Sequence, residues 1–550
     1  MSVISYTTKI IYFLSFICVI LNKSCHGEVF SSVHKLQNLA RNEGRLLQAF
    51  RDYKDHFNKR GEHLPDVICA YYAELNPVVT KSSTDKAFAE NPINVLHLLN
   101  RLLNTWPLVF KTIVCHNCNL TIPENELNTT YTLIQNETDD WPTEYDLHSA
   151  VRSFLRLRIT YQLPVNKLLQ GIIYNEHTDP LTSSLIELIL FEAEDLQMYD
   201  EVMTWCDVIL SMLPTLTLAN SSRIEMDVKQ VKARIYSKAG FNKNAANLLR
   251  EYSITGTLSV KENLKYYEDT TDEDTGFVDE WPLPLSTREE DSDYMQLCRG
   301  AKVKPSEEIS RLSCYLSNTK IPYYKAKAEE MNLDPRIIVF HDVISVDEMN
   351  FLKKEGSKVF SRSGIQNKGL PTKNDDDFRV SFTGWVLDGS DPDSISRKLS
   401  VRVGLISGLD TKYKEIFSSS EAFQVVNYGI GGMFNVHRDN LYHPYWGPSS
   451  PADIYYVRGS GDRIATWMFY INDVRAGGAT IFPRTNTRIP VIKGAAAFWY
   501  NLLPSGEIDD RVFHGGCPVL LGSKWISNKW IRESGQMFRR PCALKYDATV

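Results

Sequence analysis

The sequence predicts a multidomain protein with an α-helical N-terminal half and a C-terminal domain folded as a double-sheet β jelly roll. Its 550 residues, 43% of them hydrophobic, suffice for several cores. Segments with helical periodicity fill the first half, whereas short β-branched and aromatic runs separated by Gly and Pro fill the second. The net charge of −6 gives no basic footprint, so no nucleic-acid partner is expected.

Residues 1–27 have the layout of a signal peptide. Lys9 precedes the apolar run Ile10–Leu21, and Cys25 and Gly27 occupy the places where signal peptidase prefers small residues. The run is short for a membrane span, so an N-terminal anchor is the less favoured alternative, and no later run reaches that length. We therefore expect cleavage after Gly27 and a secretory-pathway protein without a membrane span.

Sequons and cysteines agree with that compartment. After the expected signal peptide, four N-x-Ser/Thr acceptors predict a glycoprotein: Asn119, Asn128, Asn136 and Asn220. Without Cys18 and Cys25, eight of the ten cysteines remain, an even number that favours disulfides but leaves their connectivity open: Cys69, Cys115, Cys118, Cys206, Cys298, Cys314, Cys517 and Cys542. Cys115 and Cys118 could form half of a zinc site or a redox dithiol, but no second Cys or His pair stands at a fitting distance.

Residues 28–139 are predicted to form a helical dimerisation domain. Apolar residues up to about residue 60 fit the a and d positions of a heptad that Glu43 and Lys54 interrupt: Val33, Leu36, Ala40, Leu47, Phe50 and Phe57. An amphipathic helix packed on its own domain gives the same pattern, but self-association is the favoured interpretation.

Residues 140–255 are predicted to form a helical peptide-binding domain. Helices are expected at Asp146–Tyr161, Leu181–Asp195, Tyr199–Leu213 and Ser222–Leu249. Paired helices of this length resemble tetratricopeptide repeats, whose concave face holds extended peptides. Segment 256–297 is rich in Asp and Glu, contains Pro282 and Pro284, and is expected to be a solvated linker.

Residues 298–550 are predicted to form the β domain, with its core at 420–535. Strands are expected at Arg336–Phe340, Phe423–Tyr428, Ile464–Ile471, Ala495–Tyr500 and Pro518–Leu521. Many short strands separated by turn signals are typical of jelly rolls and barrels.

The most informative pattern is His437-Arg438-Asp439, with His514 and Lys524 far downstream. Side chains at i and i+2 of an extended segment share a face, so His437 and Asp439 can bind one metal, and His514 completes the set if a strand from the other side of the barrel returns it. Two imidazoles and one carboxylate are the ligand set of non-haem Fe(II) oxygenases. If Lys524 shares a strand pair with His514, its ammonium can face the distal carboxylate of a keto acid chelated to the iron.

Each element has a simpler interpretation. His177-Thr178-Asp179 has the same form in a helical region without a downstream partner and is interpreted as surface or capping chemistry. The run His437 to Asn440 imitates the kinase catalytic loop, but no glycine-rich phosphate loop or D-F-G accompanies it. A lysine alone needs no function; Lys524 gains its meaning from its spacing to His514, and Lys529 is the next candidate.

A set of motifs, dense from about 420 to 542 and recognisable from about 294, is specific enough to identify a family. They are Leu297-Cys298-Arg299-Gly300, Arg311-Leu312-Ser313-Cys314, Asn427-Tyr428-Gly429, His437-x-Asp439, Asp462-Arg463-Ile464-Ala465-Thr466-Trp467, Gly477-Gly478-Ala479-Thr480-Ile481-Phe482-Pro483, Phe498-Trp499-Tyr500-Asn501-Leu502, Cys517-Pro518-Val519-Leu520 and Lys524-Trp525 to Trp530. Together they resemble the catalytic domain of collagen prolyl 4-hydroxylase α subunits.

The resemblance implies a double-stranded β-helix dioxygenase in which His437, Asp439 and His514 bind Fe²⁺ and Lys524 binds 2-oxoglutarate. The implied reaction converts peptidyl proline in X-Pro-Gly sequences to 4-hydroxyproline with dioxygen, releasing succinate and CO2, while ascorbate restores oxidised iron. This reaction needs the strong oxidant that iron forms when the keto acid is decarboxylated, because no acid or base side chain can attack an unactivated ring C–H bond.

The resemblance also implies disulfides and a partner. It pairs Cys298 with Cys314 and Cys517 with Cys542, and it implies an α2β2 tetramer with protein disulfide isomerase as the β subunit. The chain ends at Val550 without an endoplasmic-reticulum retrieval signal, so retention in the endoplasmic-reticulum lumen is expected to depend on that partner.

The peptide-binding tyrosines of related enzymes are only partly present. A row of aromatic faces there stacks on proline-rich peptide. Tyr161 matches one of them. The later positions are filled around Glu194, Asp200 and Ser237, with Tyr199 and Tyr236 nearby. Weaker or altered capture of long proline-rich chains is predicted.

Three interpretations of the function follow. The leading one is a peptidyl-proline 4-hydroxylase acting on collagen-like chains. Its candidate peptide contacts are Arg379, Trp385 and Tyr428, and the alternative for these residues is ordinary packing in the core. The second keeps the dioxygenase chemistry but acts on a non-collagen secreted peptide. The third is a catalytically silent subunit that binds proline-rich chains.

Overall fold

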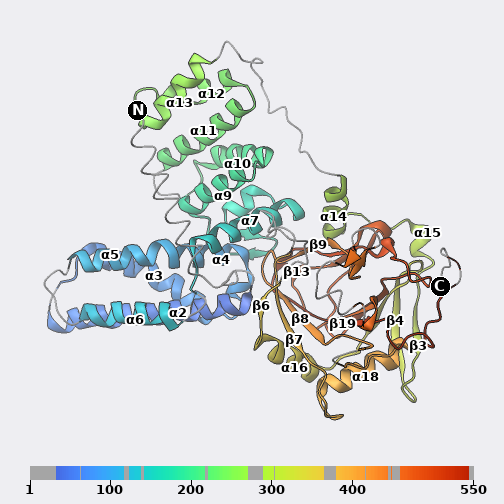
Figure 1. Ribbon diagram of the computed structural model, residues 1–550. Helices are drawn as coiled ribbons and strands as arrows, with labels where there is room; N and C mark the ends of the chain where they lie inside the picture. The colour runs from blue at the N-terminus through green and yellow to red at the C-terminus, as the bar shows by residue number, and fades with distance from the viewer. Residues whose placement is uncertain are drawn as a thin grey trace.

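The computed structural model describes residues 32–61, 63–116, 123–137, 141–216, 221–270, 289–302, 304–363, 379–414, 417–443, 447–448, 457, 459–543 and 545. Helices fill the N-terminal half, and β-sheets flanked by a few helices fill the C-terminal half, which confirms the predicted fold class (Figure 1). The expected signal peptide, Cys118, Asn119 and Asn220 lie outside the described residues, as do the side chains of Cys115, Asn128 and Asn136.

The predicted dimerisation domain is a bundle of helices. α2 (Val33–Arg60) begins after the N-cap Ser32 and ends at Gly61, whose left-handed backbone (φ 66°) suits glycine. The bundle continues with α3 (Asp66–Thr84), η2 (Phe88–Glu90), α4 (Pro92–Asn100), the π-helical turn η3 (Arg101–Thr105), α5 (Trp106–His116) and α6 (Pro123–Glu137).

The apolar face of α2 is buried within its own chain. All six heptad positions are at most 6% exposed: Val33, Leu36, Ala40, Leu47, Phe50 and Phe57. The helix packs on α3 and α6, and the interrupting Glu43 is buried too, accepting hydrogen bonds from Arg101 (2.8 and 2.7 Å) and from the indole of Trp106 (3.1 Å). The alternative, an amphipathic helix packed on its own domain, therefore describes the apolar face of α2. Self-association stays a prediction and would have to use another surface.

The second helical group contains the predicted peptide-binding helices. Its elements are α7 (Glu144–Tyr161), α8 (Val165–Leu169), β1 (Ile172–Ile173), β2 (Glu176–His177), α9 (Ser183–Asp195), α10 (Tyr199–Met212), α11 (Ser221–Lys238), α12 (Asn242–Leu249), η4 (Arg250–Tyr252) and α13 (Leu258–Asp269). The single helix expected at Ser222–Leu249 is two helices, because the chain turns at Gly240, where φ is 84°.

The predicted linker is helical at both ends. α13 buries Val260, Leu264 and Tyr267, while its acidic residues face solvent. α14 (Glu289–Arg299) carries the buried Leu297 onto the β half. The many acidic residues made these apolar positions hard to recognise in the sequence. The expectation of a solvated segment is therefore wrong for the two helices. Residues 271–288 between them lie outside the described part.

Two sheets form the β half. The larger one has the order β3 (Cys314–Asn318), β4 (Lys325–Asn332), β5 (Ile337–His341), β16 (Ala496–Tyr500), β12 (Arg463–Tyr470), β19 (Lys524–Arg532), β8 (Phe423–Tyr428), β7 (Phe382–Val386) and β6 (Ser361–Arg362). The smaller one has the order β15 (Thr487–Ile489), β14 (Thr480–Phe482), β17 (His514–Gly516) and β9 (Phe434–His437). Short antiparallel pairs join β10 (Tyr442–His443) to β11 (Gly447–Pro448) and β13 (Ala476–Gly477) to β18 (Val519–Leu521).

The larger sheet is covered on both faces. Helices α16 (Val346–Ser357) and α18 (Ile395–Ser407) lie against its outer face, where Leu352 and Leu399 share a core with Trp467 (Figure 1). Its inner face packs on the smaller sheet, where Tyr428 and Phe482 share a second core. The strands predicted from the sequence are all present, within one residue of their expected bounds.

Short elements complete the domain: α15 (Ser306–Ile309), η6 (Pro483–Thr485) and η7 (Asp510–Val512).

The helical half and the β half share one apolar core. Val380, Ile430, Leu520 and Leu521 of the β half belong to the same cluster of buried side chains as the helices. At its edge Arg475 forms an ion pair with Glu90 (3.2 Å) and a second with Glu176. An interface of this apolar kind fixes two domains against each other, so the helices are held in place relative to the sheets.

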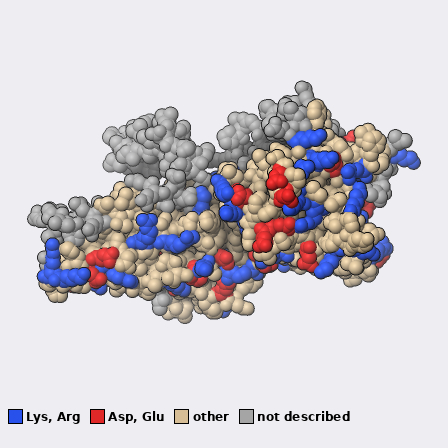
Figure 2. All heavy atoms as spheres, turned by 90° about the horizontal axis from the view of Figure 1, so that it is seen from below, with Lys and Arg blue, Asp and Glu red and all other residues tan. Residues whose placement is uncertain are grey.

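The surface carries mixed charge. Figure 2 shows Lys and Arg side chains interspersed with Asp and Glu over one face of the described residues. Among these residues, every helix is too short or too polar to cross a membrane.

Candidate metal centre

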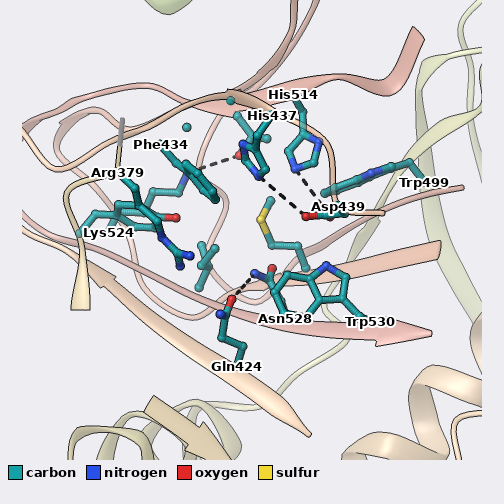
Figure 3. A pocket seen from close by; sticks show the side chains of 16 residues that line it. Arg379, Gln424, Phe434, His437, Asp439, Trp499, His514, Lys524, Asn528 and Trp530 are labelled. Atoms are coloured by element: carbon teal, nitrogen blue, oxygen red, sulfur yellow. Dashed lines mark hydrogen bonds and ion pairs between the residues drawn. The ribbon is translucent and has the colours of Figure 1, made fainter. Parts of the chain in front are cut away.

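Two histidines meet on neighbouring strands of the smaller sheet. β9 and β17 run antiparallel, and His437 and His514 are direct partners in their register, with ring centroids 4.4 Å apart. His514 is therefore brought to His437 by the neighbouring strand of the same sheet, and the expected strand from the other side of the barrel is wrong. Asp439 lies just beyond the end of β9, two positions after His437, and turns its carboxylate toward both rings (Figure 3).

The three side chains form a compact set of donor atoms. Nε2 of His437 lies 3.8 Å from Asp439 Oδ1, and Nε2 of His514 lies 3.7 Å from Asp439 Oδ2. One ligand atom from each residue falls within 4.8 Å of the others. Among the described residues this is the group of His, Cys, Asp and Glu side chains that could hold a metal ion.

Hydrogen bonds prepare both imidazoles for metal binding. Nδ1 of His437 lies 2.8 Å from the carbonyl oxygen of Asn435, and Nδ1 of His514 lies 3.1 Å from that of Val512. A carbonyl only accepts, so each Nδ1 carries the proton and each Nε2 keeps its lone pair for a metal. This tautomer is the one that a ligand set requires.

Burial and neighbouring charge set the protonation states. Burial, assisted by His514, lowers the pKa of His437 to about 3. Burial alone raises the pKa of Asp439, but His514, His437 and Arg463 outweigh it and hold that pKa below its ordinary value. At neutral pH the site therefore offers a neutral imidazole and a carboxylate anion, which suit Fe²⁺ with positions left open on the metal.

Lys524 faces the same cavity from the opposite sheet. It begins β19 in the larger sheet, whereas His514 belongs to the smaller one, so the expected shared strand pair is wrong and the two residues approach across the barrel. Its Nζ lies 3.3 Å from Thr480 Oγ1 and near the faces of Tyr428 (5.6 Å) and Tyr470 (5.8 Å). Within the described part of the chain no carboxylate pairs with it, and burial lowers its pKa to about 7.

Lys529 is excluded as the anion-binding lysine of this cavity. It points to the other face of the larger sheet, where its Nζ lies 2.7 Å from Asp388 Oδ1. Both side chains are fully buried there. The alternation of a strand explains this, because positions 524 and 529 differ by an odd number and so face opposite ways.

The predicted peptide contacts are only partly gathered at the cavity. Tyr428 and Arg379 line it and are buried, and the guanidinium of Arg379 lies 4.5 Å from the ring of Phe434 (Figure 3). Trp385 is not among the lining residues; it is 44% exposed and packs against Trp530, which does line the cavity, with ring centroids 6.1 Å apart.

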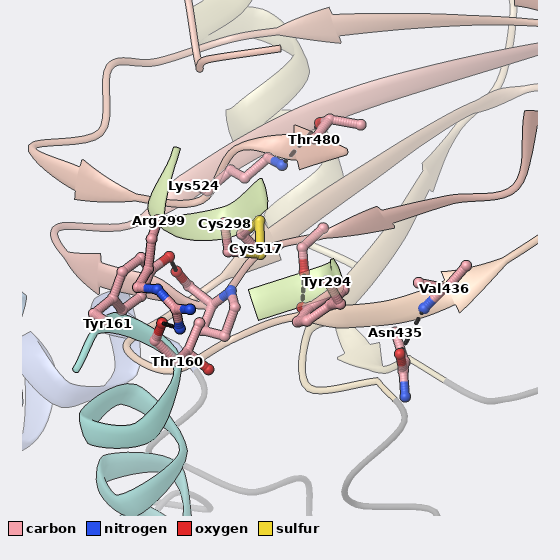
Figure 4. The surroundings of a disulfide bond; sticks show 12 residues. Thr160, Tyr161, Tyr294, Cys298, Arg299, Asn435, Val436, Thr480, Cys517 and Lys524 are labelled. Atoms are coloured by element: carbon pink, nitrogen blue, oxygen red, sulfur yellow. Dashed lines mark hydrogen bonds between the residues drawn. A yellow bond between two sulfur atoms is a disulfide. The ribbon is translucent and has the colours of Figure 1, made fainter. Parts of the chain in front are cut away.

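Tyr161 lies where the helical half meets the β half. Its hydroxyl donates a hydrogen bond to the carbonyl oxygen of Pro518 (2.5 Å), at the contact between α7 and the β half (Figure 4). Burial raises the pKa of this phenol. The hydroxyl is thus engaged inside the chain, and stacking of the ring on a proline-rich peptide stays a prediction.

Charged side chains occupy the region expected to carry the tyrosine row. Glu194 accepts hydrogen bonds from Arg234 (2.7 Å) and Lys238 (2.8 Å), and Ser237 bonds to Asn242. The ammonium of Lys238 lies over the ring of Tyr199 (5.5 Å). The face is therefore built from paired charges and partly covered aromatic rings.

Several lining residues escaped the sequence reasoning. They are Gln424, Phe434, Thr480, Asn528 and Trp530. Asn528 and Trp530 could have been found from the sequence. They stand an even number of positions after Lys524 on β19, so they face the same side of the sheet as the lysine assigned to the cavity. Thr480 follows a pair of glycines and offers no such signal.

The predicted disulfides are wrong in the structure. Cys298 on α14 bonds to Cys517 just beyond β17, with Cα atoms 5.5 Å apart (Figure 4). Cys314 begins β3 at the edge of the larger sheet, Cys542 lies in the C-terminal segment, and both are exposed thiols. The pairing follows from α14 docking on the smaller sheet, a contact that separation along the chain cannot reveal.

Comparisons with known proteins agree over nearly the whole chain. Residues 32–175 match the family model of the prolyl 4-hydroxylase alpha-subunit N-terminal region, and residues 423–532 match that of the 2OG-Fe(II) oxygenase superfamily. Bovine prolyl 4-hydroxylase subunit alpha-3 is 30% identical over 553 residues, covering 94% of this chain and 95% of that protein. The mouse alpha-1 subunit is 29% identical over 548 residues, covering 94% and 96%. A crystal structure of a viral collagen prolyl hydroxylase from Paramecium Bursaria Chlorella virus-1, complexed with 2OG, is 26% identical, covers 36% of this chain and 95% of that one, and has a TM-score of 0.26.

Proposed function

Because this chain belongs to the family of prolyl 4-hydroxylase α subunits, we propose that it hydroxylates proline in X-Pro-Gly sequences of collagen-like chains. The reaction class follows from the family and the matched oxygenase domain: it is an enzyme that hydroxylates proline with Fe²⁺ and 2-oxoglutarate. The observation that carries the proposal is that His437, Asp439, His514 and Lys524 line one cavity.

His437, Asp439 and His514 are the proposed iron ligands. When bound, iron with 2-oxoglutarate and dioxygen supplies the oxidant that an unactivated ring C–H bond requires. The chain's own contribution is to present two Nε2 atoms and one carboxylate, each held by hydrogen bonds before a metal would bind. Preorganised donors of this kind spare the site a rearrangement during the reaction.

Lys524 is proposed to bind the distal carboxylate of 2-oxoglutarate, with Thr480 beside it. A buried ammonium without a carboxylate partner strongly favours an incoming anion. Aromatic walls from Tyr428 and Tyr470 surround the ammonium and exclude water, which strengthens the pairing. The co-substrate is thereby held at one end by a fixed cation.

Replacing Lys524 with methionine is expected to raise the KM for 2-oxoglutarate by about 100-fold or more, because a buried charge-assisted pair contributes about 3 kcal/mol. Methionine keeps most of the buried stem, so the sheet is preserved. The measurement is the initial rate of succinate release against 2-oxoglutarate concentration. The exposed Lys493→Met is the matched control and is expected to leave KM unchanged. An unchanged KM in Lys524→Met would contradict the assignment.

Affinity for 2-oxoglutarate is expected to fall as the pH rises above about 7, the pKa of the Lys524 ammonium before an anion joins it. Above that pH the amine is neutral and must first take up a proton, so affinity falls by up to about tenfold per unit. An ordinary lysine would give a flat profile up to about pH 9. Calorimetric titration of the metal-loaded enzyme from about pH 6.5 to about pH 9 separates the two cases.

Arg379, Trp385 and Tyr428 are proposed to contact the peptide near the iron. Arg379 and Tyr428 line the cavity, and the exposed Trp385 packs against Trp530, which lines it too. A second candidate function, hydroxylation of a non-collagen secreted peptide, is favoured by one observation: charged pairs around Glu194 stand where related enzymes bind proline-rich chains. Helices 140–255 would then select a peptide with charges of its own.

One assay separates the candidates. The purified assembly is incubated with Fe²⁺, 2-oxoglutarate and ascorbate, and with either (Pro-Pro-Gly) repeats or a proline-containing peptide library. We expect succinate release coupled to 4-hydroxyproline in the repeats. Turnover confined to non-collagen peptides would support the second candidate, and a metal-loaded assembly inactive on every peptide would support a silent subunit.

The partner, compartment and reductant are proposed from the family. A β subunit of the protein disulfide isomerase kind would complete an α2β2 tetramer in the endoplasmic-reticulum lumen, and the N-terminal region would join the α subunits. Ascorbate would restore oxidised iron. Signal-peptide cleavage after Gly27 and glycosylation at the sequons belong to the same proposal.

A further inference from the structure

The carboxylate of Asp439 has a dedicated hydrogen-bond donor. Asp439 lies beyond the last residue of β9, so strand pairing does not hold its backbone and other contacts must fix the residue. Its Oδ2 accepts a hydrogen bond from Oγ1 of Thr466 (2.6 Å). This is the same oxygen that lies 3.7 Å from Nε2 of His514, so the hydroxyl acts directly on the face that meets the imidazoles.

Thr466 is a rigid donor. It lies within β12, the strand at the centre of the larger sheet, where it pairs with Trp499 on one side and Trp530 on the other. Its side chain is 1% exposed, and a β-branched residue in a strand has few rotamers. The hydroxyl position is therefore fixed by the sheet itself.

Asn501 fixes the direction of the Thr466 hydroxyl. Its Nδ2 donates to Thr466 Oγ1 (3.0 Å) and also to the carbonyl oxygen of Arg463 (3.3 Å). An amide N–H occupies a lone pair of the threonine oxygen, so the hydroxyl proton is directed at Asp439. The Thr466 hydroxyl also lies 3.4 Å from Asn501 Oδ1, but its 2.6 Å contact with Asp439 Oδ2 is much the shorter, so the chain of donors runs from Asn501 through Thr466 to the carboxylate.

A second clamp holds the backbone of Asp439. Arg463 Nη1 donates to the Asp439 carbonyl oxygen (3.2 Å), and two bonds to Glu421 (2.6 and 2.8 Å) fix the guanidinium. With the backbone secured, the remaining freedom of Asp439 is rotation of its side chain. The Thr466 hydroxyl is the group that removes it.

We propose that Thr466 is a positioning residue that sets the orientation of the Asp439 carboxylate toward the two histidines, and so sets metal affinity, with Asn501 directing its hydroxyl. The inference rests on the proposed iron site. Thr466 belongs to the motif Asp462–Trp467, which is one of the motifs that identify the family in the sequence. The inference gives this motif a role beyond forming a strand.

The test compares Thr466→Val, which removes the donor at constant shape, with Thr466→Ser, which keeps it. Anaerobic titration of the full assembly with Fe²⁺, and with Co²⁺ as a spectroscopic probe, measures the dissociation constant without turnover. We expect Thr466→Val to weaken metal binding by about 10- to 100-fold, the range found when groups behind a ligand are removed, and Thr466→Ser to stay within about threefold of the wild type.

Thr411→Val is the matched control. Thr411 is also buried in the β half, but its hydroxyl bonds to the carbonyl of Ser400. We expect its metal affinity to match the wild type even if its melting temperature falls. If Thr466→Val does not fold, Thr466→Ala removes the same hydroxyl with a smaller side chain and serves the same test.

Three negative results would have different meanings. A folded Thr466→Val or Thr466→Ala protein that binds metal as tightly as the wild type would overturn the role of Thr466. A wild-type assembly that binds neither Fe²⁺ nor Co²⁺ would instead overturn the proposed iron site. Loss of affinity in Thr466→Ser equal to that in Thr466→Val would also count against the inference, because the hydroxyl would not be the cause.

Discussion

Replacing His514 with alanine is expected to lower the rate of proline hydroxylation by more than about 100-fold, since losing a group behind a metal ligand already costs about 10- to 100-fold and this change removes the ligand itself. His437→Ala and Asp439→Ala are expected to act alike. Each residue supplies one donor atom, and the structure gathers the three within 4.8 Å. Succinate release and hydroxyproline analysis measure the rate, and Fe²⁺ titration of the same proteins measures the metal.

The chain provides its own control for this prediction. His177 stands two positions before Asp179, in the same H-x-D spacing as the proposed site, but it is exposed on β2. His177→Ala is expected to keep full activity and full metal content. Wild-type turnover in His514→Ala, with iron still bound, would exclude this residue from the ligand set.

Removing one partner of the pair between Lys529 and Asp388 is expected to lower the free energy of unfolding by about 3–5 kcal/mol. The two atoms lie 2.7 Å apart, and neither side chain is more than 1% exposed. In Lys529→Ala the Asp388 carboxylate stays buried on the segment between β7 and α18 without a cation beside it. Urea unfolding followed by tryptophan fluorescence measures the loss.

Two further variants identify the cause of this loss. The double change Lys529→Met with Asp388→Leu is expected to recover most of the stability, because it removes both charges and their desolvation cost together. Lys327→Ala breaks a pair of the same length with Asp342, but both side chains are largely exposed, so stability is expected to be unchanged. Equal losses in Lys529→Ala and the double variant would point to packing and not to charge.

The sequence was most informative where a pattern is local. β8 has its predicted bounds because a β-branched run between a serine-rich loop and a glycine turn has one good conformation. The spacing of His437 and Asp439 likewise anticipates a shared direction, since i and i+2 side chains of an extended segment point the same way. Helices α7, α9 and α10 followed from periodicity alone.

Features that depend on distant contacts could not be predicted. The bond between Cys298 and Cys517 joins residues 219 positions apart, through the docking of α14. Lys524 and Lys529 look alike in the sequence and stand on the same strand, so only the location of the cavity on one face of the sheet distinguishes them. Among the described residues Lys524 has no carboxylate partner there, whereas Lys529 forms a buried ion pair on the other face. The hydrogen bond of Tyr161 to Pro518 is another such contact, since it joins residues on either side of the boundary between the two halves.

The shared core of the two halves has a consequence for dissection of the protein. Val380, Ile430, Leu520 and Leu521 fill spaces among the helices, and Arg156 on α7 reaches the carbonyl of Gly431 in the loop before β9. A helical fragment that ends near residue 255 lacks these side chains of the β half. It would therefore expose apolar surface that is buried in the full chain and would tend to aggregate. Chimeras that exchange helices between relatives would have to preserve this junction, because a change in α7 also changes the packing beside the loop before β9.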